Sequence, residues 1–484
     1  MPTGGLAATK VRPPGPPAQL VGRARLEDRL VEAIDSRIPL ILVSAPAGSG
    51  KSTLVAAWAA RSPVAVAWLQ LDDSDADPVR CWRSVAAAVR RASPSLAQRF
   101  DPVVAGSGGD ADVIVPAFVN LIEQTGERLV LVLDDYHLID DRSVHSAVEQ
   151  LVDRCPPDLT IVVVTRADPP FRLGRFRVRD RIREIRATDL RFQPDEATTL
   201  LGQSADVLGD ALADLYERTE GWAAGLVLAR LSIERTDDVA RFVRTFRGDD
   251  HLVASYLTDE LLASLDPAER TRLVEAATLH RLTGDLIDAV TGSTDGARWL
   301  SDLADRNQLV IRLDSVGEWF RYHHLFRDLL LMEARRTFPD RLPDLHRRAA
   351  AWFEEAGLTA AAVDHLLEAG DRDRAMHLMR FVGPDLLGSG QLKTMRNILR
   401  RLSDGGELDA ICTILSGWDH YLTGRYETAQ VLLDRSYGLL TPDVDAMRAM
   451  PLRINLALGR GDVATALAGA EEVVAAGDVE HRPS

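Results

Sequence analysis

The sequence predicts a chain of several domains, in which an α/β domain built on a parallel sheet is followed by helical domains. Three observations indicate this fold class. Over the first 190 residues, continuous aliphatic runs alternate with helical stretches, which is the pattern of βαβ units around a parallel sheet. After about residue 190 the strand signal fades and helical periodicity replaces it. Beyond residue 340, glycine-centred turns recur at an almost constant interval, as in stacked helix pairs.

Four aliphatic runs predict the strands of the sheet. Their apolar residues are continuous rather than alternating, which is typical of strands that are buried on both faces. The runs are residues 38–44, 64–71, 128–137 and 158–170. Helices are expected over about 52–60 and over 79–91.

The helical part of the chain contains one further strand signal. Pro194, followed directly by two acids, predicts that a helix begins there. Residues 308–326 resemble a β-hairpin with its turn around Ser315 to Gly317, and helices on both sides of it predict a winged helix. The expected boundaries are a flexible proline-rich leader at 1–17, the α/β domain at 18–190, a helical domain at 191–250, the winged helix at 251–340 and a helical array at 341–484.

The helical array is predicted from a repeated turn. Gly357, Gly390, Gly424 and Gly461 are spaced by 33, 34 and 37 residues, and each is followed five positions later by a small or apolar residue. A period near 34 indicates tetratricopeptide-like helix pairs that stack into a solenoid. The alternative is four coincidental glycine turns in an alanine-rich helical region. We expect an incomplete array, because the last residues show no polar capping helix.

Composition and charge restrict the class of protein. Apolar residues make up 46% of the chain and charged residues 27%, as in ordinary globular proteins, and the net charge of -15 argues against a surface that coats nucleic acid or anionic membrane. Cys81, Cys155 and Cys412 are widely spaced, which predicts reduced thiols and neither a disulfide framework nor a zinc site. No apolar run reaches about 18 residues, so no membrane span is expected. The reduced thiols predict a cytoplasmic protein.

A phosphate-binding loop is predicted between the first strand and the next helix. The segment "APAGSGKS" at 45–52 has the required spacing, except that Ala45 holds the usual first glycine. Glycines in the loop let backbone N–H groups turn toward phosphate oxygens, and the following helix N-terminus adds its positive end. The flanking strand and helix favour this interpretation over a plain strand-to-helix turn. The predicted nucleotide cradle comprises Ala45, Pro46, Ala47, Gly48, Ser49, Gly50, Lys51, Ser52 and Thr53, in an α/β P-loop NTPase domain.

Lysine usage supports this loop. The chain has 57 basic residues but only three lysines, Lys10, Lys51 and Lys393. A compact ammonium tracks phosphate oxygens in a way that a planar guanidinium does not. Lys51 is expected to neutralise the β- and γ-phosphates of ATP, and Ser52 to bind Mg²⁺ through its hydroxyl.

Polar residues at the ends of two later strands complete the candidate site. Asp134 and Asp135 end the third aliphatic run, where carboxylates lie beside a phosphate loop; we expect Asp134 to bind Mg²⁺ and Asp135 to polarise the attacking water. Arg166 ends the fourth run and is expected to sense the γ-phosphate, although a solvent-facing arginine is an alternative.

Two weaker signals concern the base and the winged helix. Val21, Gly22 and Arg23 could line an adenine pocket, but the same segment is also an ordinary start of an amphipathic helix. His323 and His324 are adjacent on a predicted helix start, so they point apart and cannot form a metal pair; one packed and one solvated imidazole is the simpler interpretation.

These elements together resemble the STAND class of signalling ATPases, and most closely its branch of large LuxR-type regulators. The resemblance is carried by "LVGRARLEDRL", "SAPAGSGKSTL", "LVLVLDDYHLI", "VVVTRADPP" and "EWFRYHHLFRDLL", with "GWAAGL" at 221–226 in addition. It implies that His323 contacts the β-phosphate of bound ADP and that Arg166 is the sensor arginine. It also implies ATP-driven self-assembly into a homo-oligomer once an inducer or protein partner binds the helical array.

The resemblance does not extend to DNA binding. Such regulators usually end in a helix-turn-helix, which is not found by residue 484, so we expect DNA contact only through a C-terminal domain absent from this chain. The predicted winged helix is no substitute, since residues 251–340 hold 15 acids and 10 bases.

The leading hypothesis is therefore a slow, switch-like ATPase that acts within a transcription regulator. One alternative is a remodelling ATPase of the AAA+ type, which the site chemistry permits although no pore-loop aromatic motif is present. Another is an interaction scaffold with a vestigial nucleotide site. A GTPase is disfavoured, because none of the three lysines lies in an NKxD-type motif.

Overall fold

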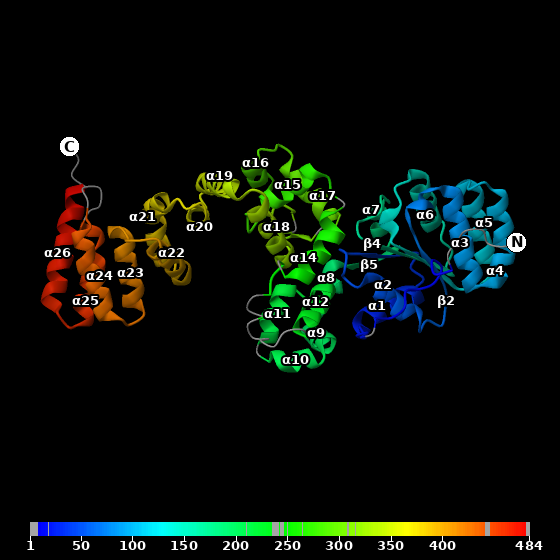
Figure 1. Cartoon of the computed structure of the whole chain (residues 1–484), viewed down its shortest axis with the longest axis horizontal. Coiled ribbons are helices and arrows are strands. Elements are labelled where there is room, and N and C mark those ends of the chain that lie inside the picture. Colours follow the sequence, from blue (N-terminus) through cyan, green and yellow to red (C-terminus); the bar gives the residue numbers. More distant parts are fainter. Residues whose placement is uncertain are drawn as a thin grey trace. The chain divides into compact units, whose positions relative to one another are not determined.

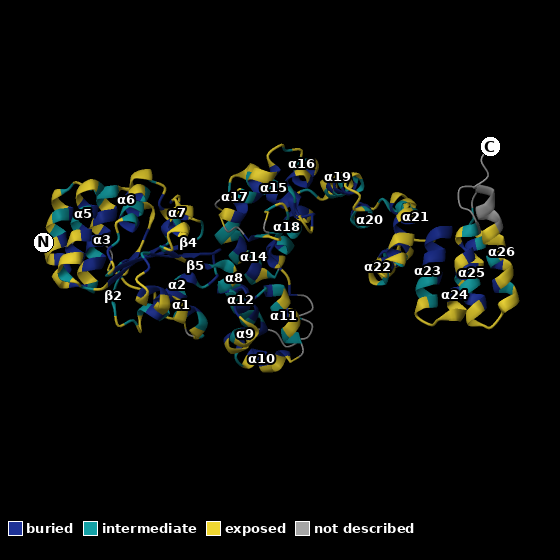
Figure 2. Cartoon of the chain, turned by 180° about the vertical axis from the view of Figure 1, so that it is seen from behind, coloured by how far each residue is buried: buried dark blue, intermediate teal, exposed yellow. Residues whose placement is uncertain are grey.

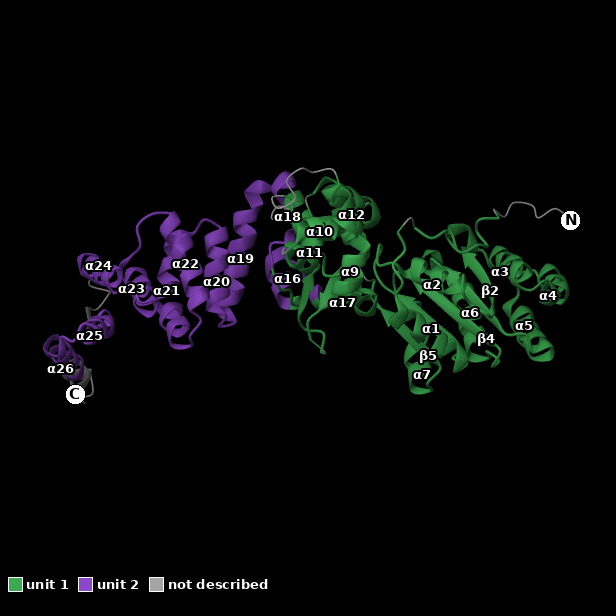
Figure 3. Ribbon diagram, turned by 90° about the horizontal axis from the view of Figure 1, so that it is seen from below, with its two compact units in different colours: residues 1–273, 280–284, 297–333 green, residues 274–279, 285–296, 334–484 purple. Residues whose placement is uncertain are grey.

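The computed structural model describes residues 8–480 except 18, 210, 235–241, 243–245, 249, 264, 307–308, 315 and 441–445. The chain forms two compact units, coloured separately in Figure 3. The first unit comprises residues 1–273, 280–284 and 297–333, and the second comprises 274–279, 285–296 and 334–484. No helix among the described residues is long and apolar enough to cross a membrane.

A five-stranded parallel sheet is the centre of the first unit, which confirms the predicted α/β class. Its strand order is β2-β3-β4-β1-β5, and all four pairings are parallel. The four predicted strands are present, and a fifth, β5, pairs with β1 at the sheet edge. The strands are β1 (Leu40–Ser44), β2 (Ala65–Gln70), β3 (Leu129–Asp134), β4 (Leu159–Thr165) and β5 (Ile182–Arg186).

Helices cover both faces of this sheet, because successive side chains of each buried strand point to opposite sides. In β1, Leu40 and Leu42 enter one hydrophobic core, whereas Ile41 and Val43 enter the other. The second of these cores is covered by α1 and α2, and the first by α3 to α7 (Figure 1). Strands β1, β3 and β4 are buried along their whole length (Figure 2). The helices are α1 (Ala24–Asp35), α2 (Lys51–Ala59), α3 (Pro78–Ala92), α4 (Pro94–Gly106), α5 (Ala111–Thr125), α6 (Arg142–Asp153), α7 (Leu173–Val178) and α8 (Ala187–Leu190), with short 3₁₀ turns at Asp73–Ala76 and Tyr136–Leu138.

The described residues between 194 and 337 form helices and one small hairpin. Strands β6 (Val310–Arg312) and β7 (Phe320–Tyr322) pair antiparallel, as predicted, and Leu282 forms a further bridge to Phe320. Ser315, placed in the predicted turn, lies outside the described residues. The helices are α9 (Pro194–Leu201), α10 (Gln203–Leu208), α11 (Ala211–Thr219), α12 (Ala223–Ile233), α14 (His251–Leu257), a π-helical turn (Thr258–Leu262), α15 (Pro267–Ala276), α16 (Gly284–Thr291), α17 (Gly296–Asp305) and α18 (His324–Thr337).

Helix pairs make up the described part of the chain beyond residue 337, as predicted. Each of the four repeated glycines lies in the turn between the two helices of a pair and has a positive φ, between 72° and 78°. This left-handed conformation carries no steric penalty for glycine. The elements are a 3₁₀ turn (Pro339–Arg341), α19 (Leu342–Glu355) and α20 (Thr359–Glu368), α21 (Arg372–Gly388) and α22 (Leu392–Asp404), α23 (Ala410–Leu422) and α24 (Tyr426–Gly438), a 3₁₀ turn (Ala446–Arg448), and α25 (Met450–Gly459) and α26 (Val463–Glu480).

Part of the predicted leader is anchored to the sheet. The ammonium of Lys10 lies 2.7 Å from a carboxylate oxygen of Asp72 and 2.5 Å from one of Asp75, and its carbonyl accepts from the N–H of Gln70. Residues 1–7 lie outside the described residues. The finer domain boundaries remain a prediction.

Candidate nucleotide-binding site

The loop between β1 and α2 has the backbone conformation that a phosphate cradle needs. Gly48 and Gly50 adopt left-handed conformations, with φ of 68° and 80°, and α2 begins directly after them at Lys51. Within the described part of the chain, the N–H groups of residues 47–53 donate to no protein acceptor. Seven amide donors at a helix N-terminus are thus available to an anion. The loop fits the phosphates of a nucleotide.

Lys51 adds a buried cation to this cradle. Its side chain is 8% exposed, and its ammonium donates to the carbonyl of Pro46 at 2.9 Å. Burial, reinforced by the charge of Arg166, lowers the pKa of Lys51 to about 8. A bound phosphate group would raise the pKa of Lys51 again, because its negative charge compensates the buried ammonium.

Two carboxylates at the end of β3 lie beside the loop. The hydroxyl of Ser52 donates to Oδ1 of Asp134 at 2.8 Å, which brings the two predicted Mg²⁺ ligands together. Burial, and then the neighbouring charge of Asp135, raise the pKa of Asp134 to about 6. The described residues hold no cluster of three or more His, Cys, Asp or Glu that could bind a metal alone. Two protein oxygens combined with phosphate oxygens and water are a usual environment for Mg²⁺, so the residues fit this ion.

A cavity of about 490 Å³ gathers most of the predicted site residues. Asp135 and Arg166 line it near the loop, and it continues to an apolar end formed by residues such as Phe192, Leu200 and Val227. A cavity with a charged end and an apolar end suits a nucleotide, whose phosphates and base differ in the same way. The predicted residues in its lining are Val21, Arg23, Ala47, Gly48, Gly50, Lys51, Ser52, Thr53, Asp135 and Arg166.

The structure also fixes Arg23 at the apolar end. Its guanidinium donates to the carbonyl oxygens of Leu190 and Arg191 at 2.7 and 2.9 Å and lies 4.3 Å from the centre of the Phe192 ring. Burial lowers its pKa to about 10. Gly22, predicted beside it, does not line the cavity.

Other predicted residues lie near the cavity without lining it. Ala45 is fully buried in the core under α1 and α2, and its φ is not positive, so alanine fits this position without backbone strain. Pro46 and Ser49 face a second, smaller cavity of about 70 Å³. His323 lines that smaller cavity too, whereas Asp134 touches the site through Ser52.

His323 is buried in a tight environment that also contains the charged residues Glu220 and Arg191. Its Nε2 lies 3.1 Å from the carbonyl oxygen of Thr219, and its ring packs edge-on against Trp222 with centres 5.7 Å apart. Burial lowers its pKa to about 4, and its buried Nδ1 has no hydrogen-bond partner among the residues that the structure describes. A neutral imidazole with an unsatisfied nitrogen beside the loop leaves room for a polar ligand atom or water, but contact with a β-phosphate remains a prediction.

Residues of the helical region cover the loop, and sequence analysis assigned none of them a role. The indole N–H of Trp222 donates to the carbonyl of Ala47 at 3.1 Å, and the N–H of Ala224 donates to that of Gly48 at 2.9 Å. A Cβ placed on Gly48 would lie 2.5 Å from Cβ of Ala224 and 2.7 Å from the hydroxyl of Tyr256. Trp222 and Ala224 lie in the "GWAAGL" stretch, which could have indicated their role because it is part of the family resemblance. No motif in the sequence pointed to Tyr256.

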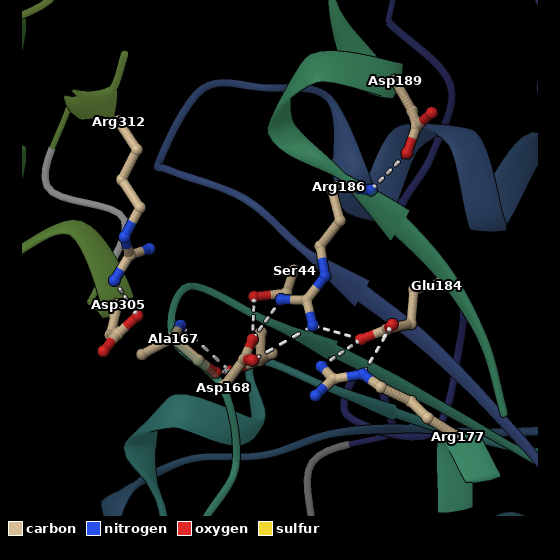
Figure 4. Close-up of polar contacts among 10 residues, drawn as sticks. Ser44, Ala167, Asp168, Arg177, Glu184, Arg186, Asp189, Asp305 and Arg312 are labelled. Atoms are coloured by element: carbon tan, nitrogen blue, oxygen red, sulfur yellow. Dashed lines mark hydrogen bonds and ion pairs between the residues drawn. The ribbon is translucent and has the colours of Figure 1, made fainter. Parts of the chain in front are cut away.

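Arg166 is held from the same side. Its guanidinium pairs with the carboxylate of Glu260 at 2.8 Å, in the π-helical turn. Nearby, Ser44 and Arg186 both donate to Asp168, which follows β4, and Arg186 also pairs with Glu184 (Figure 4). These contacts brace the strand ends from which Arg166 projects.

Comparisons with known proteins identify two domains in the chain. Residues 19–164 match the family described as AAA ATPase domain, and residues 258–342 match the MalT winged helix domain. These two domains define a class, namely P-loop ATPases that carry a MalT-type winged helix. The chain therefore carries the domains of a MalT-like P-loop ATPase.

The matches to individual relatives cover different shares of each relative's length. The serine/threonine-protein kinase PknK of Mycobacterium tuberculosis is 34% identical over 409 residues, which is 83% of this chain and 37% of PknK. The HTH-type transcriptional regulator MalT of Klebsiella pneumoniae is 29% identical over 453 residues, 91% of this chain and 50% of MalT. The chain thus spans half or less of these relatives. A solved STAND protein with a tetratricopeptide repeat sensor, PH0952 of Pyrococcus horikoshii, overlays with a TM-score of 0.37 at 15% identity, over 96% of this chain and 66% of that one.

Proposed function

We propose that this chain is the nucleotide-dependent switch of a LuxR-type transcription regulator. It binds ATP or ADP with Mg²⁺, hydrolyses ATP slowly and self-assembles when an inducer or protein partner binds the helical array. One observation carries the proposal: a single cavity is lined both by the phosphate loop and by residues more than 170 positions later, among them Ala223, Tyr256 and Glu260. Nucleotide phosphates in such a cavity act directly on the elements that cover it.

Each predicted residue except Gly22 keeps a defined role in this proposal. Lys51 and the loop amides bind phosphate oxygens, and Ser52 and Asp134 hold Mg²⁺, which neutralises phosphate charge. Asp135 polarises the attacking water, and Arg166 senses the third phosphate. Val21 and Arg23 surround the base, and His323 meets the β-phosphate of ADP.

The switch is a population shift between two arrangements of the chain. ADP favours a closed monomer, in which the contacts of Trp222 and Ala224 with the loop are kept. ATP together with the inducer favours an open form, so the inducer must bind the open form more tightly than the closed one. Hydrolysis resets the switch and is therefore expected to be slow.

Light scattering tests this switch. The protein is incubated with ADP-Mg²⁺ and with ATP-Mg²⁺, and its mass is followed over a range of concentrations. We expect a monomer in ADP and a larger species only in ATP. The inducer should extend the range of protein concentrations over which the larger species forms. Stable assembly in ADP and not in ATP contradicts the proposal, and rapid ATP turnover by the protein alone favours a remodelling ATPase.

A further inference from the structure

The helical segment 251–262, formed by α14 and the π-helical turn, presents two side chains to the nucleotide cavity. Tyr256 and Glu260 are four residues apart and both line the cavity. Residues at this spacing lie on one face of a helix. π-helical turns occur frequently at functional sites, because they redirect a side chain within a helix. The roles assigned so far leave Glu260 without one.

Glu260 is bound to the residue that would sense the third phosphate. Its Oε2 accepts from Arg166 at 2.8 Å, and its backbone carbonyl accepts from the other terminal nitrogen of that guanidinium at 3.4 Å. Both side chains are 36% exposed and both line the cavity, together with Lys51 and Asp135. The carboxylate also acts on Lys51 through its charge, opposing the fall in the lysine pKa. Glu260 is therefore an anion at the phosphate end of the cavity.

We propose that Glu260 sets the preference of the site between nucleoside diphosphate and nucleoside triphosphate. The proposal rests on the function proposed above. A diphosphate leaves the Arg166–Glu260 pair intact. A third phosphate brings a second anion to the same guanidinium, so the carboxylate must either withdraw or remain beside a like charge.

This competition gives the third phosphate a mechanical consequence. Withdrawal of Glu260 removes a contact between the strand end that carries Arg166 and the segment 251–262. That segment also holds Tyr256 against Gly48. The carboxylate thus links the presence of the third phosphate to release of the element that covers the loop.

The test compares ATP and ADP binding by calorimetry, each with excess Mg²⁺, using the whole chain. Variants are Glu260→Gln and the matched control Asp259→Asn, which removes the same charge from the neighbouring position but outside the cavity lining. We expect Glu260→Gln to strengthen ATP relative to ADP about tenfold, a common size for coupling between sites, and Asp259→Asn to leave the ratio unchanged. Glu260→Ala removes the same charge but leaves a smaller side chain. It must shift the ratio of ATP to ADP affinity in the same direction as Glu260→Gln.

The outcomes separate this proposal from the function on which it rests. An unchanged ATP/ADP ratio in both Glu260 variants, or an equal shift in Asp259→Asn, overturns the role of Glu260 and leaves nucleotide binding intact. A wild-type protein that binds neither nucleotide overturns the proposed function and this proposal together. Thermal unfolding of each variant identifies any loss of fold, in which case the remaining Glu260 variant decides.

Discussion

Lys51 gives the site a pH dependence that can be measured. Phosphate favours the charged ammonium, whereas burial in the nucleotide-free protein lowers its pKa to about 8. Binding therefore takes up a proton near that pH, and affinity falls as pH rises through it. We expect ATP affinity to fall about tenfold between pH 7 and pH 9. A guanidinium stays charged over this range, so Lys51→Arg should bind with a flatter pH profile; equal slopes in both proteins contradict the assignment.

Asp134 should determine the response to magnesium. Its pKa of about 6 means that acidification below pH 6 protonates the proposed ligand and weakens Mg²⁺ binding. Removing Mg²⁺ with a chelator should lower ATP affinity of the wild type by about tenfold or more, whereas Asp134→Asn should respond little because its carboxylate is already lost. Calorimetry with and without chelator measures both. A full magnesium response in Asp134→Asn would assign the metal to another residue.

Among the elements, strands β1 to β4 were predictable, whereas β5, one of the two edge strands, was not. Strands β1 to β4 show continuous aliphatic runs because both their faces are covered. In β5, charged Arg183, Glu184 and Arg186 fit an edge position and remove that signal. The phosphate loop and Asp134 follow from local spacing. Tyr256 and Glu260 could not be predicted, because their proximity to the loop comes from packing between segments that are far apart in sequence.

The turn before α12 is tied to the hairpin by a buried ion pair. The carboxylate of Glu220, whose side chain is 7% exposed, accepts twice from Arg321 at 2.7 Å and also pairs with Arg191. Burial opposes its ionisation, but the hydrogen bonds from Arg321 and the positive charges around it lower its pKa to about 2. A depressed carboxylate pKa stabilises the folded protein above the unfolded value near 4.5, and this contribution is lost as pH falls toward 2.

Glu220→Gln should consequently lower the free energy of unfolding by about 3 kcal/mol at pH 7, since it leaves Arg321 without its carboxylate. The variant should also lose part of the acid dependence between pH 4.5 and pH 2. Urea unfolding at several pH values measures both effects, with Glu217→Gln on the exposed face of α11 as the control. Equal stability of the two variants contradicts the role of the pair.

Trp222 should restrain the loop. Trp222→Phe removes the hydrogen bond to Ala47, which is worth about 1 kcal/mol, so ADP should dissociate about fivefold faster. Stopped-flow displacement of a fluorescent ADP analogue measures the rate. Trp319→Phe makes the same change in the hairpin, away from the loop, and should release ADP at the wild-type rate. Identical rates in all three proteins show that Trp222 does not hold the closed form.

For the whole chain to work as a switch, bound nucleotide must act beyond the sheet. The first unit contains the nucleotide cavity, and the second contains the helix pairs proposed to receive the inducer. The order of the α/β domain, the helical domains and the helical array along the chain could be predicted from the sequence. Each of these parts has its own periodic pattern of apolar residues or turns. The chemistry of the inducer does not follow from these patterns, because a helical array is defined by its apolar positions rather than by its surface.

Calorimetric titration of the whole chain with ATP and ADP tests the central claim, which is that an adenine nucleotide binds at the turn after β1. The wild type should take up one nucleotide per chain with Mg²⁺ present, and Lys51→Ala should bind about 10- to 100-fold more weakly, as expected for a lost charge-assisted contact. Correctly folded wild-type protein that takes up neither nucleotide, or a Lys51→Ala variant with unchanged affinity, contradicts the claim.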